Sequence, residues 1–279
     1  MGHCPMSVPS GKLAQGIRAE WQEAGAKMFD LTDRTALVSG ASRGIGEALA
    51  AGLARAGADV VVTARSRAGL DALCKVVRGH GRKALPLAMD VLDEAAIDTA
   101  FSAMNDAGMR PDILVNNAGM EKVCPSVDVS SDLFDRILGT NLRGAFLVAR
   151  NFARPLLAEG RTGAIINLCS LTSEIGVPTA TPYTASKSGL LGMTRALAAE
   201  WAQAGIRVNG IGPGYFRTEL TEAFYADRSW QDAMLAKIPM RRFGQLEDLV
   251  GSCVFLASPA AAYITGQVIY VDGGYLASI

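Results

Sequence analysis

Tyr183 and Lys187 are the residues whose types and spacing most directly suggest chemistry. They stand four positions apart in Tyr183-Thr-Ala-Ser-Lys187, and that spacing puts both side chains on one face of a helix. A free phenol has a pKa of about 10, which a nearby ammonium group lowers. We therefore expect Tyr183 to exchange a proton with a substrate oxygen, as an acid or as a base.

Ser170 strengthens this interpretation, because a tyrosine and a lysine at this spacing also occur by chance on solvated helix faces. The serine ends the predicted strand Gly163–Cys169, at the carboxyl edge where open α/β sheets bind ligands. Its hydroxyl can hydrogen-bond the same substrate oxygen. Together the three residues favour acid–base chemistry at a carbonyl or alcohol oxygen.

A glycine-rich turn predicts a dinucleotide site. The predicted strand Thr35–Ser39 runs into Gly40-Ala-Ser-Arg-Gly44-Ile-Gly46 and then into a helix. Glycines at such a turn let the backbone approach a pyrophosphate and place it on the helix N-terminus. The spacing differs from the usual G-x-G-x-x-G, and plain glycine turns and methyltransferases have related patterns, so the turn does not decide the function alone.

Arginines near this turn favour a phosphorylated cofactor. An acidic residue about 20 positions past the glycines would hold a ribose 2′-hydroxyl, but Ala64 and Arg65 occupy that place and Arg43 lies inside the turn. Two guanidinium groups suit a 2′-phosphate, because each offers paired planar donors. We predict NADP(H) in preference to NAD(H); the alternative is that both arginines are solvated at a surface turn.

Two more strand ends belong to the predicted cofactor site. Asp90-Val91 follows the third strand and could place a carboxylate near an adenine amino group, although an aspartate there is as often a helix cap. Asn116-Asn-Ala-Gly119 closes the fourth strand with small residues, which would let a flat cofactor ring pass.

The elements that must position these residues alternate between short apolar runs and longer helical patterns. This alternation is typical of βαβ units, and strands that are apolar nearly throughout are buried on both faces. We predict a single α/β Rossmann-type doubly wound sandwich, with seven mostly parallel strands and helices on both faces. The predicted strands are Thr35–Ser39, Asp59–Thr63, Ala84–Met89, Asp112–Asn116, Gly163–Cys169, Ile206–Ile211 and Gln267–Val271. The predicted helices are Gly46–Arg55, Ala68–Arg78, Glu94–Asn105, Leu133–Leu157, Tyr183–Gln203 and Glu247–Leu256, and residues 218–244 are predicted to be an irregular insertion.

Composition disfavours several classes of function. Lysine and arginine number 27 and aspartate and glutamate number 27, so the net charge is zero and no long-range field attracts nucleic acid or an anionic membrane. No apolar run could span a bilayer. Five scattered cysteines and two histidines argue against a disulfide framework, a metal site or a Ser-His-Asp triad. We expect a cytoplasmic protein with a small-molecule substrate.

Residues 1–27 are interpreted as an extension before a catalytic domain over residues 28–279. Leu13, Ile17, Trp21 and Ala24 have helical spacing and predict one short amphipathic helix. A start of translation at Met28 is an equally good explanation of this composition.

From Phe29 to Gly274 the chain resembles the short-chain dehydrogenase/reductase family. The glycine turn, Asn116-Asn-Ala-Gly119 and a catalytic tetrad at Asn141, Ser170, Tyr183 and Lys187 carry the resemblance. It implies hydride transfer between a nicotinamide cofactor and a secondary alcohol or ketone, with Asn141 holding a water that relays protons through Lys187. It also implies a homotetramer. The expected cofactor-binding residues are Gly40, Ser42, Arg43, Gly44, Ile45, Gly46, Arg65, Asp90, Val91, Asn117, Ala118, Gly119, Tyr183, Lys187, Pro213, Gly214 and Thr218, the last of which would bond the nicotinamide carboxamide.

Within the family, the strings Cys169–Gly176, Pro213–Glu219 and Gln267–Gly274 resemble gluconate 5-dehydrogenases. The resemblance implies a sugar acid or polyol such as D-gluconate or 5-keto-D-gluconate, which needs hydrogen-bonding groups for its hydroxyls and a cation for its carboxylate. The expected substrate contacts are Ser170, Ser173, Glu174, Lys122, Tyr215 and Arg217, of which Ser173, Glu174, Lys122 and Arg217 are as well explained as exposed loop residues.

Two alternatives stay open. A 3-oxoacyl-[acyl-carrier-protein] reductase would share the tetrad and NADP(H), but it would also want a basic docking patch for an acidic carrier protein. A non-catalytic NADP(H)-binding regulator would keep the fold without the chemistry, and the presence of Tyr183 and Lys187 argues against it.

Overall fold

Parallel strands form one sheet in the part of the chain that the structure describes, which is residues 28–218 and 225–278 of a computed structural model. In these residues the sheet has 7 strands in the order β3-β2-β1-β4-β5-β6-β7, and each neighbouring pair is parallel. The predicted doubly wound topology is confirmed, and its switch point lies between β1 and β4. The strands are β1 (Thr35–Ser39), β2 (Asp59–Ala64), β3 (Ala84–Ala88), β4 (Ile113–Asn116), β5 (Gly163–Leu168), β6 (Ile206–Pro213) and β7 (Val268–Val271).

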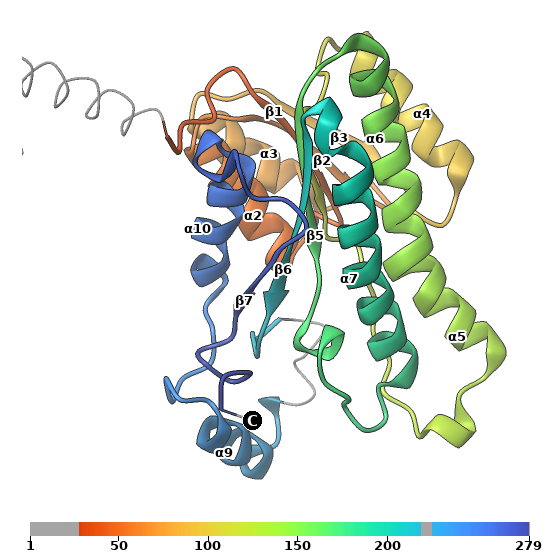
Figure 1. The fold of residues 1–279 in the computed structure, drawn as a ribbon, viewed down its shortest axis with the longest axis vertical. Helices are drawn as coiled ribbons and strands as arrows, with labels where there is room; N and C mark the ends of the chain where they lie inside the picture. The colour runs from red at the N-terminus through yellow and green to blue at the C-terminus, as the bar shows by residue number, and fades with distance from the viewer. Residues whose placement is uncertain (1–27, 219–224, 279) are drawn as a thin grey trace, which may run out of the picture.

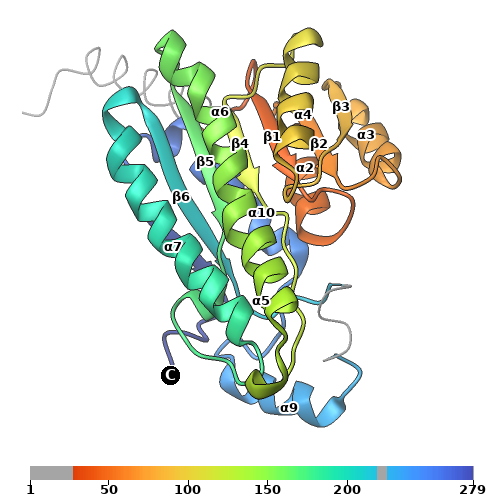
Figure 2. The same cartoon turned by 90° about the vertical axis from the view of Figure 1, so that its right-hand side faces the viewer.

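Helices cover both faces of the sheet, as Figures 1 and 2 show. Alternate residues of β1 point to opposite faces, so Val38 belongs to one buried cluster and Leu37 to the other. The first cluster includes residues of α2 (Gly44–Arg55), α3 (Leu70–Gly79) and α10 (Leu246–Ala257). The second includes residues of α4 (Glu94–Asp106), α6 (Ala145–Glu159) and α7 (Thr181–Trp201).

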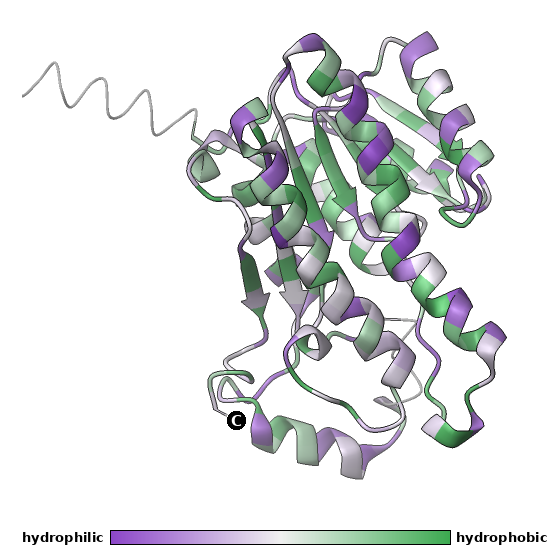
Figure 3. Ribbon diagram, turned by 45° about the vertical axis from the view of Figure 1, so that its right-hand side comes forward, coloured by the Kyte–Doolittle hydropathy of each residue, from purple (hydrophilic) through white to green (hydrophobic). Residues whose placement is uncertain are grey.

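The strands are apolar because both of their faces are covered. Val60, Val61 and Val62 follow one another in β2 and all are 0% exposed, as in sheets that carry helices on both sides. Figure 3 shows the apolar strands inside and polar stretches on the helices that cover them.

A glycine sets how closely two helices of the first face approach each other. A Cβ atom at Gly52 of α2 would lie 2.3 Å from Cγ1 of Val250 on α10, far inside van der Waals contact. Only a residue without a side chain fits at this crossing.

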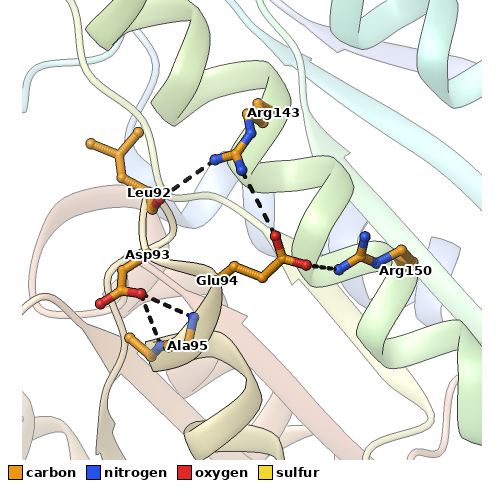
Figure 4. A network of polar contacts seen from close by, with 7 residues as sticks. Leu92, Asp93, Glu94, Ala95, Arg143 and Arg150 are labelled. Carbon is orange, nitrogen blue, oxygen red and sulfur yellow. Dashed lines mark hydrogen bonds and ion pairs between the residues drawn. The ribbon is translucent and has the colours of Figure 1, made fainter.

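The N-terminus of α4 is fixed by polar contacts (Figure 4). Asp93 caps the helix by accepting hydrogen bonds from the backbone N–H groups of Ala95 and Ala96. Glu94 lies between Arg150 of α6, with which it forms an ion pair, and Arg143, whose guanidinium is 3.8 Å away. These exposed pairs contribute little to stability individually, but they connect α4 to its neighbour on the same face.

The predicted helix Leu133–Leu157 is one helical path with an irregular middle. It consists of α5 (Ser131–Leu138), a π-helical segment Gly139–Gly144 and α6. Single π turns inside α-helices are rare and are often found at functional sites. Here the wide turn contains Asn141, a member of the expected tetrad.

The predicted insertion 218–244 is not irregular throughout. It contains α9 (Arg228–Lys237), whose first turn is capped by Asp227, and α9 lies beyond the end of β6 (Figure 1). Trp230 of α9 contacts the rings of Tyr215, Tyr225 and Phe243. The prediction missed α9 because its anchoring aromatic residues come from separate segments rather than from a helical repeat.

Two expectations concern residues outside the described part of the chain, namely the helix in residues 1–27 and the end of the string Pro213–Glu219. Among the described residues, no helix is both long and apolar enough to cross a membrane.

Candidate active site

A cavity of about 450 Å³ lies at the carboxyl ends of the strands, which is the size range of small-molecule sites. It brings together residues from the first glycine turn, the ends of β2, β3, β4 and β5, and helix α7. With the exception of Gly46, all of the expected cofactor residues line it: Gly40, Ser42, Arg43, Gly44, Ile45, Arg65, Asp90, Val91, Asn117, Ala118, Gly119, Tyr183, Lys187, Pro213, Gly214 and Thr218.

The glycine turn has the backbone shape that its sequence requires. Gly40 and Gly44 have φ angles of 65° and 60°, in the left-handed region that glycine adopts without strain. Gly46 lies behind the wall of the cavity, where a Cβ atom would come 2.4 Å from Nδ2 of Asn117 and 2.5 Å from the carbonyl oxygen of Gly40. Its role is therefore close packing of α2 under the turn.

The first turn of α2 has the character of an anion site. No side chain caps this helix, whereas Asp93 and Ser130 cap α4 and α5. Uncapped N–H groups at a helix N-terminus attract phosphate, so the residues present fit the pyrophosphate of a dinucleotide.

A buried hydroxyl connects the glycine turn to the end of β4. Oγ of Ser39 accepts hydrogen bonds from the backbone N–H groups of Asn117 and Ala118, both at 3.1 Å. The Asn117 amide in turn donates to the carbonyl oxygens of Ser39 and Gly40. These bonds hold the two walls of the cofactor end at a fixed separation.

The two arginines and Asp90 occupy the predicted places. Arg43 and Arg65 are exposed and both line the cavity. Asp90 accepts a hydrogen bond from the backbone N–H of Leu92, while Asp93 caps α4. The helix-cap alternative for Asp90 is therefore wrong, and its place in the cavity wall agrees with the adenine alternative.

Tyr183, Lys187 and Ser170 converge in the cavity as predicted. The Lys187 ammonium is buried, donates to the carbonyl oxygen of Leu168 at 2.5 Å and lies 5.5 Å from the centroid of the Tyr183 ring. The Ser170 hydroxyl is near enough to Tyr183 to act on its pKa. The strand end and the helix face thus present both hydroxyls at one point.

The electrostatics of the pair differ from the sequence prediction. Burial raises the pKa of Tyr183 above its usual value, the Glu121 charge adds to the rise, and the hydrogen bond with Ser170 opposes it. Burial lowers the pKa of Lys187 to about 8, with Cys169 and Glu121 opposing. The prediction that Lys187 lowers the Tyr183 pKa is wrong for the protein alone, because desolvation is the largest effect on both groups.

Asn141 supports the site from behind the cavity wall. Its Oδ1 accepts from the backbone N–H of Met120 at 2.8 Å, and its Nδ2 donates to the Met120 carbonyl oxygen at 2.9 Å and to Oγ of Ser186 at 3.0 Å. The amide therefore joins the end of β4 to helix α7. The water relay implied by the family resemblance stays a prediction.

Buried amides anchor the catalytic helix to the sheet. Asn116 of β4 donates to Oδ1 of Asn167 on β5 at 3.0 Å, and Asn167 donates to Oγ1 of Thr194 on α7 at 2.9 Å. Groups of this kind are costly to bury unless they are paired. The chain of bonds fixes α7, and with it Tyr183 and Lys187, relative to the strand ends.

Three of the expected substrate residues have other roles. Ser173 is buried; its hydroxyl donates to the Lys187 carbonyl oxygen and accepts from the Ser170 N–H. Glu174 accepts from the Tyr270 hydroxyl at 2.8 Å. Tyr215 lines a neighbouring cavity of about 230 Å³ and packs edge-on against Tyr275. These side chains shape the loops around the site.

The two cations expected to bind the substrate carboxylate do not line the main cavity. Lys122 and Arg217 are exposed, and neither is among the described residues that line the main cavity, whereas Ser170 is. The structure therefore does not bring either cation together with the catalytic residues, and their role toward a carboxylate stays a prediction.

Comparison with known proteins decides the family. A family model described as Enoyl-(Acyl carrier protein) reductase, of the short-chain dehydrogenase type, matches residues 40–276. The chain belongs to the short-chain dehydrogenase/reductase family. The expected membership is confirmed, and the glycine turn and the tetrad lie within the matched residues.

Relatives of this short-chain dehydrogenase include a gluconate dehydrogenase and a carrier-protein reductase. Gluconate 5-dehydrogenase of Gluconobacter oxydans (strain 621H) is 41% identical over 253 residues, covering 90% of this chain and 98% of the relative. The 3-oxoacyl-[acyl-carrier-protein] reductase of Vibrio harveyi is 37% identical over 246 residues, covering 88% and 98%.

Solved structures share its fold closely. A Sinorhizobium meliloti 1021 protein, provisionally classed as a short-chain alcohol dehydrogenase, is 56% identical with a TM-score of 0.88, covering 90% of this chain and 100% of that one. A gluconate 5-dehydrogenase from Burkholderia cenocepacia J2315, in complex with NADP and tartrate, is 38% identical with a TM-score of 0.88, covering 91% and 100%.

The prediction from the sequence did not include some residues of this dehydrogenase site. Glu121 lines the cavity directly after the Asn116–Met120 segment, and Arg136 and Thr140 line it from the helical path that holds Asn141. A signal for Glu121 was present, because it follows the carboxyl end of a central strand, where doubly wound sheets bind ligands.

Proposed function

We propose that this short-chain dehydrogenase transfers a hydride between NADP(H) and a secondary alcohol or ketone of a sugar acid or polyol, such as D-gluconate or 5-keto-D-gluconate. The observation that carries the proposal is the meeting of Ser170, Tyr183 and Lys187 in the same cavity as the glycine turn. Its relatedness to gluconate 5-dehydrogenases supports the substrate class.

Ser170, Tyr183 and Lys187 have different roles at the reacting oxygen. Ser170 and Tyr183 both hydrogen-bond that oxygen, and Tyr183 donates a proton to it in reduction or removes one in oxidation. Lys187, with a pKa of about 8, titrates near neutral pH close to the Tyr183 ring. A nicotinamide, when bound, supplies or accepts the hydride at the carbon.

The preference for NADP(H) rests on Arg43 and Arg65 at the cavity rim. Bidentate donors on a phosphate contribute about 1.5–3 kcal/mol for a charged hydrogen bond. We expect Arg65→Ala to raise KM for NADP+ by about tenfold or more and to leave KM for NAD+ nearly unchanged. Equal changes for both cofactors, or wild-type preference for NAD+, would contradict the proposal.

The deciding experiment follows absorbance of the reduced nicotinamide with D-gluconate, neutral polyols and a 3-oxoacyl thioester as substrates. We expect NADP+-dependent oxidation of gluconate, and Tyr183→Phe to lower kcat by at least about a thousandfold, because the proton at the reacting oxygen then has no donor. Activity confined to the thioester would select the carrier-protein reductase alternative. Absence of turnover with every substrate would select the regulator.

The sugar-acid part of the proposal has its own test. We expect Lys122→Ala or Arg217→Ala to raise KM for gluconate more than KM for a neutral ketone, since a cation would meet only the carboxylate. Equal effects on both substrates would remove these residues from the proposal. The cytoplasmic location and the homotetramer complete the proposal as predictions from the sequence and its family resemblance.

A further inference from the structure

Glu121 is a carboxylate in the catalytic cavity that has no role in the proposed hydride and proton transfer. It lines the cavity together with Ser170 and Tyr183. Its backbone position is fixed, because the preceding residue, Met120, is held through both its N–H and its carbonyl oxygen by the Asn141 amide. A carboxylate is thereby presented beside the reacting groups.

The charge of Glu121 acts on several groups of the site. It raises the pKa of Tyr183 and of Tyr215 and opposes the lowering of the Lys187 pKa. Burial raises the pKa of Glu121 itself, with Lys187 opposing. The carboxylate is therefore close to both catalytic groups and is partly removed from water.

No hydrogen bond or ion pair engages Glu121 among the described residues, although Asn141, Ser173 and Glu174 nearby are all engaged. An ionised carboxylate only accepts hydrogen bonds. Leaving a partly buried acceptor without a hydrogen-bond donor costs free energy. A substrate that donates a hydrogen bond to Glu121 would offset this cost. A hydroxyl group is a neutral donor that suits this carboxylate beside the Lys187 ammonium.

We propose that Glu121 is a specificity-determining residue that accepts a hydrogen bond from a hydroxyl group adjacent to the reacting carbon, so that the site selects vicinal diols over simple alcohols. The proposal rests on the proposed function and narrows its substrate class. It also fixes an orientation, in which the carboxylate of a sugar acid points away from Glu121. A 3-oxoacyl chain has no such hydroxyl and leaves Glu121 without a partner.

A matched pair of substrates tests this directly. Cyclohexane-1,2-diol and cyclohexanol share a ring and a reacting carbinol and differ by one neighbouring hydroxyl, and neither carries a charge. We expect the wild type to prefer the diol in kcat/KM by about 10- to 100-fold, the range of one hydrogen bond to a charged group. Glu121→Gln and Glu121→Ala should remove most of this preference through KM for the diol.

Controls separate recognition from folding and proton transfer. Asp98→Asn removes the same charge from an exposed position on α4 and should leave both substrates unaffected. Glu121→Asp, which keeps the carboxylate, should restore part of the preference. Each variant is compared on the pH plateau of its own kcat, because Glu121 also influences Tyr183.

The outcomes distinguish this proposal from the general one. Retention of the diol preference by Glu121→Gln, equal losses on both substrates, or a wild type without preference would each overturn the role of Glu121. Failure to oxidise gluconate, with the diol preference intact and lost in Glu121→Gln, would overturn the sugar-acid assignment alone.

Discussion

Burial and the neighbouring Glu121 carboxylate raise the pKa of Tyr183, and the Ser170 hydroxyl opposes them. The types and spacing of Tyr183, Lys187 and Ser170 were enough to predict their meeting, because helix and strand periodicity fix which side chains share a face. The direction of the Tyr183 pKa was not predictable. It depends on burial and on Glu121, and both follow from how the segment after β4 and helix α7 meet at one cavity in the folded chain.

The pH dependence of oxidation should report this balance. Tyr183 must be deprotonated to act as the base, so kcat/KM for oxidation rises as pH passes the Tyr183 pKa. Removing the Glu121 charge lowers this pKa and also lowers the Lys187 pKa, so Glu121→Gln should move the acid limb of the profile to lower pH.

The measurement is a pH series of kcat/KM with cyclohexanol, which has no neighbouring hydroxyl for Glu121. The other groups that act on Tyr183 are Cys169 and Ser170, and neither changes in the variant. A profile that stays in place, or one that moves to higher pH, would show that the Glu121 charge does not reach Tyr183.

Element positions were predictable to within a few residues, because buried strands and amphipathic helices have distinct periods. The π-helical interruption at Gly139–Gly144 was not predictable from the sequence. Its cause is tertiary, since the amide of Asn141 bonds the backbone of Met120. The close approach of α2 and α10 could not be predicted either. A glycine within a helical sequence pattern does not show which residue will lie opposite it in the folded chain.

The crossing of α2 and α10 gives a stability prediction. Gly52→Ala places a methyl group against the stiff side chain of Val250 and should lower the free energy of unfolding by about 1–3 kcal/mol. Gly251→Ala is the matched control, because it lies on α10 with nothing within 4 Å of the new atom, and it should raise stability by about 0.5–1 kcal/mol. Urea unfolding of both variants measures the difference; a loss of the same size in each would assign the effect to α10 rather than to the crossing.

The surface of the molecule carries large apolar side chains that are not part of its buried core. Phe134, Phe146 and Leu157 lie along the path from α5 to α6 and are 36%, 40% and 42% exposed, although other residues of α6 belong to the core. Exposed apolar side chains along one element can form part of an interface. The sequence pattern predicted apolar residues on more than one side of this helix, but it does not fix the number of subunits.

A substitution on this surface tests the predicted homotetramer. Phe146→Glu places a charge among these apolar side chains and should give a smaller species, since burying an unpaired charge at an interface is costly. Sedimentation velocity at micromolar concentration measures the mass. Val127→Glu, at a position that is 93% exposed, should leave the mass unchanged; an unaltered mass in Phe146→Glu would place the interface elsewhere.

The wide turn at Gly139–Gly144 also has a geometric consequence for every residue that follows it. Each residue of an α-helix advances the chain by about 100° around the helix axis, so one residue added to a turn rotates everything downstream by that angle. Deleting a residue here would swing Phe152, now 1% exposed and packed in the core, about a quarter of a circle toward the surface. The same wide turn therefore holds Asn141 against Met120 and Ser186 and keeps α6 in phase with the sheet.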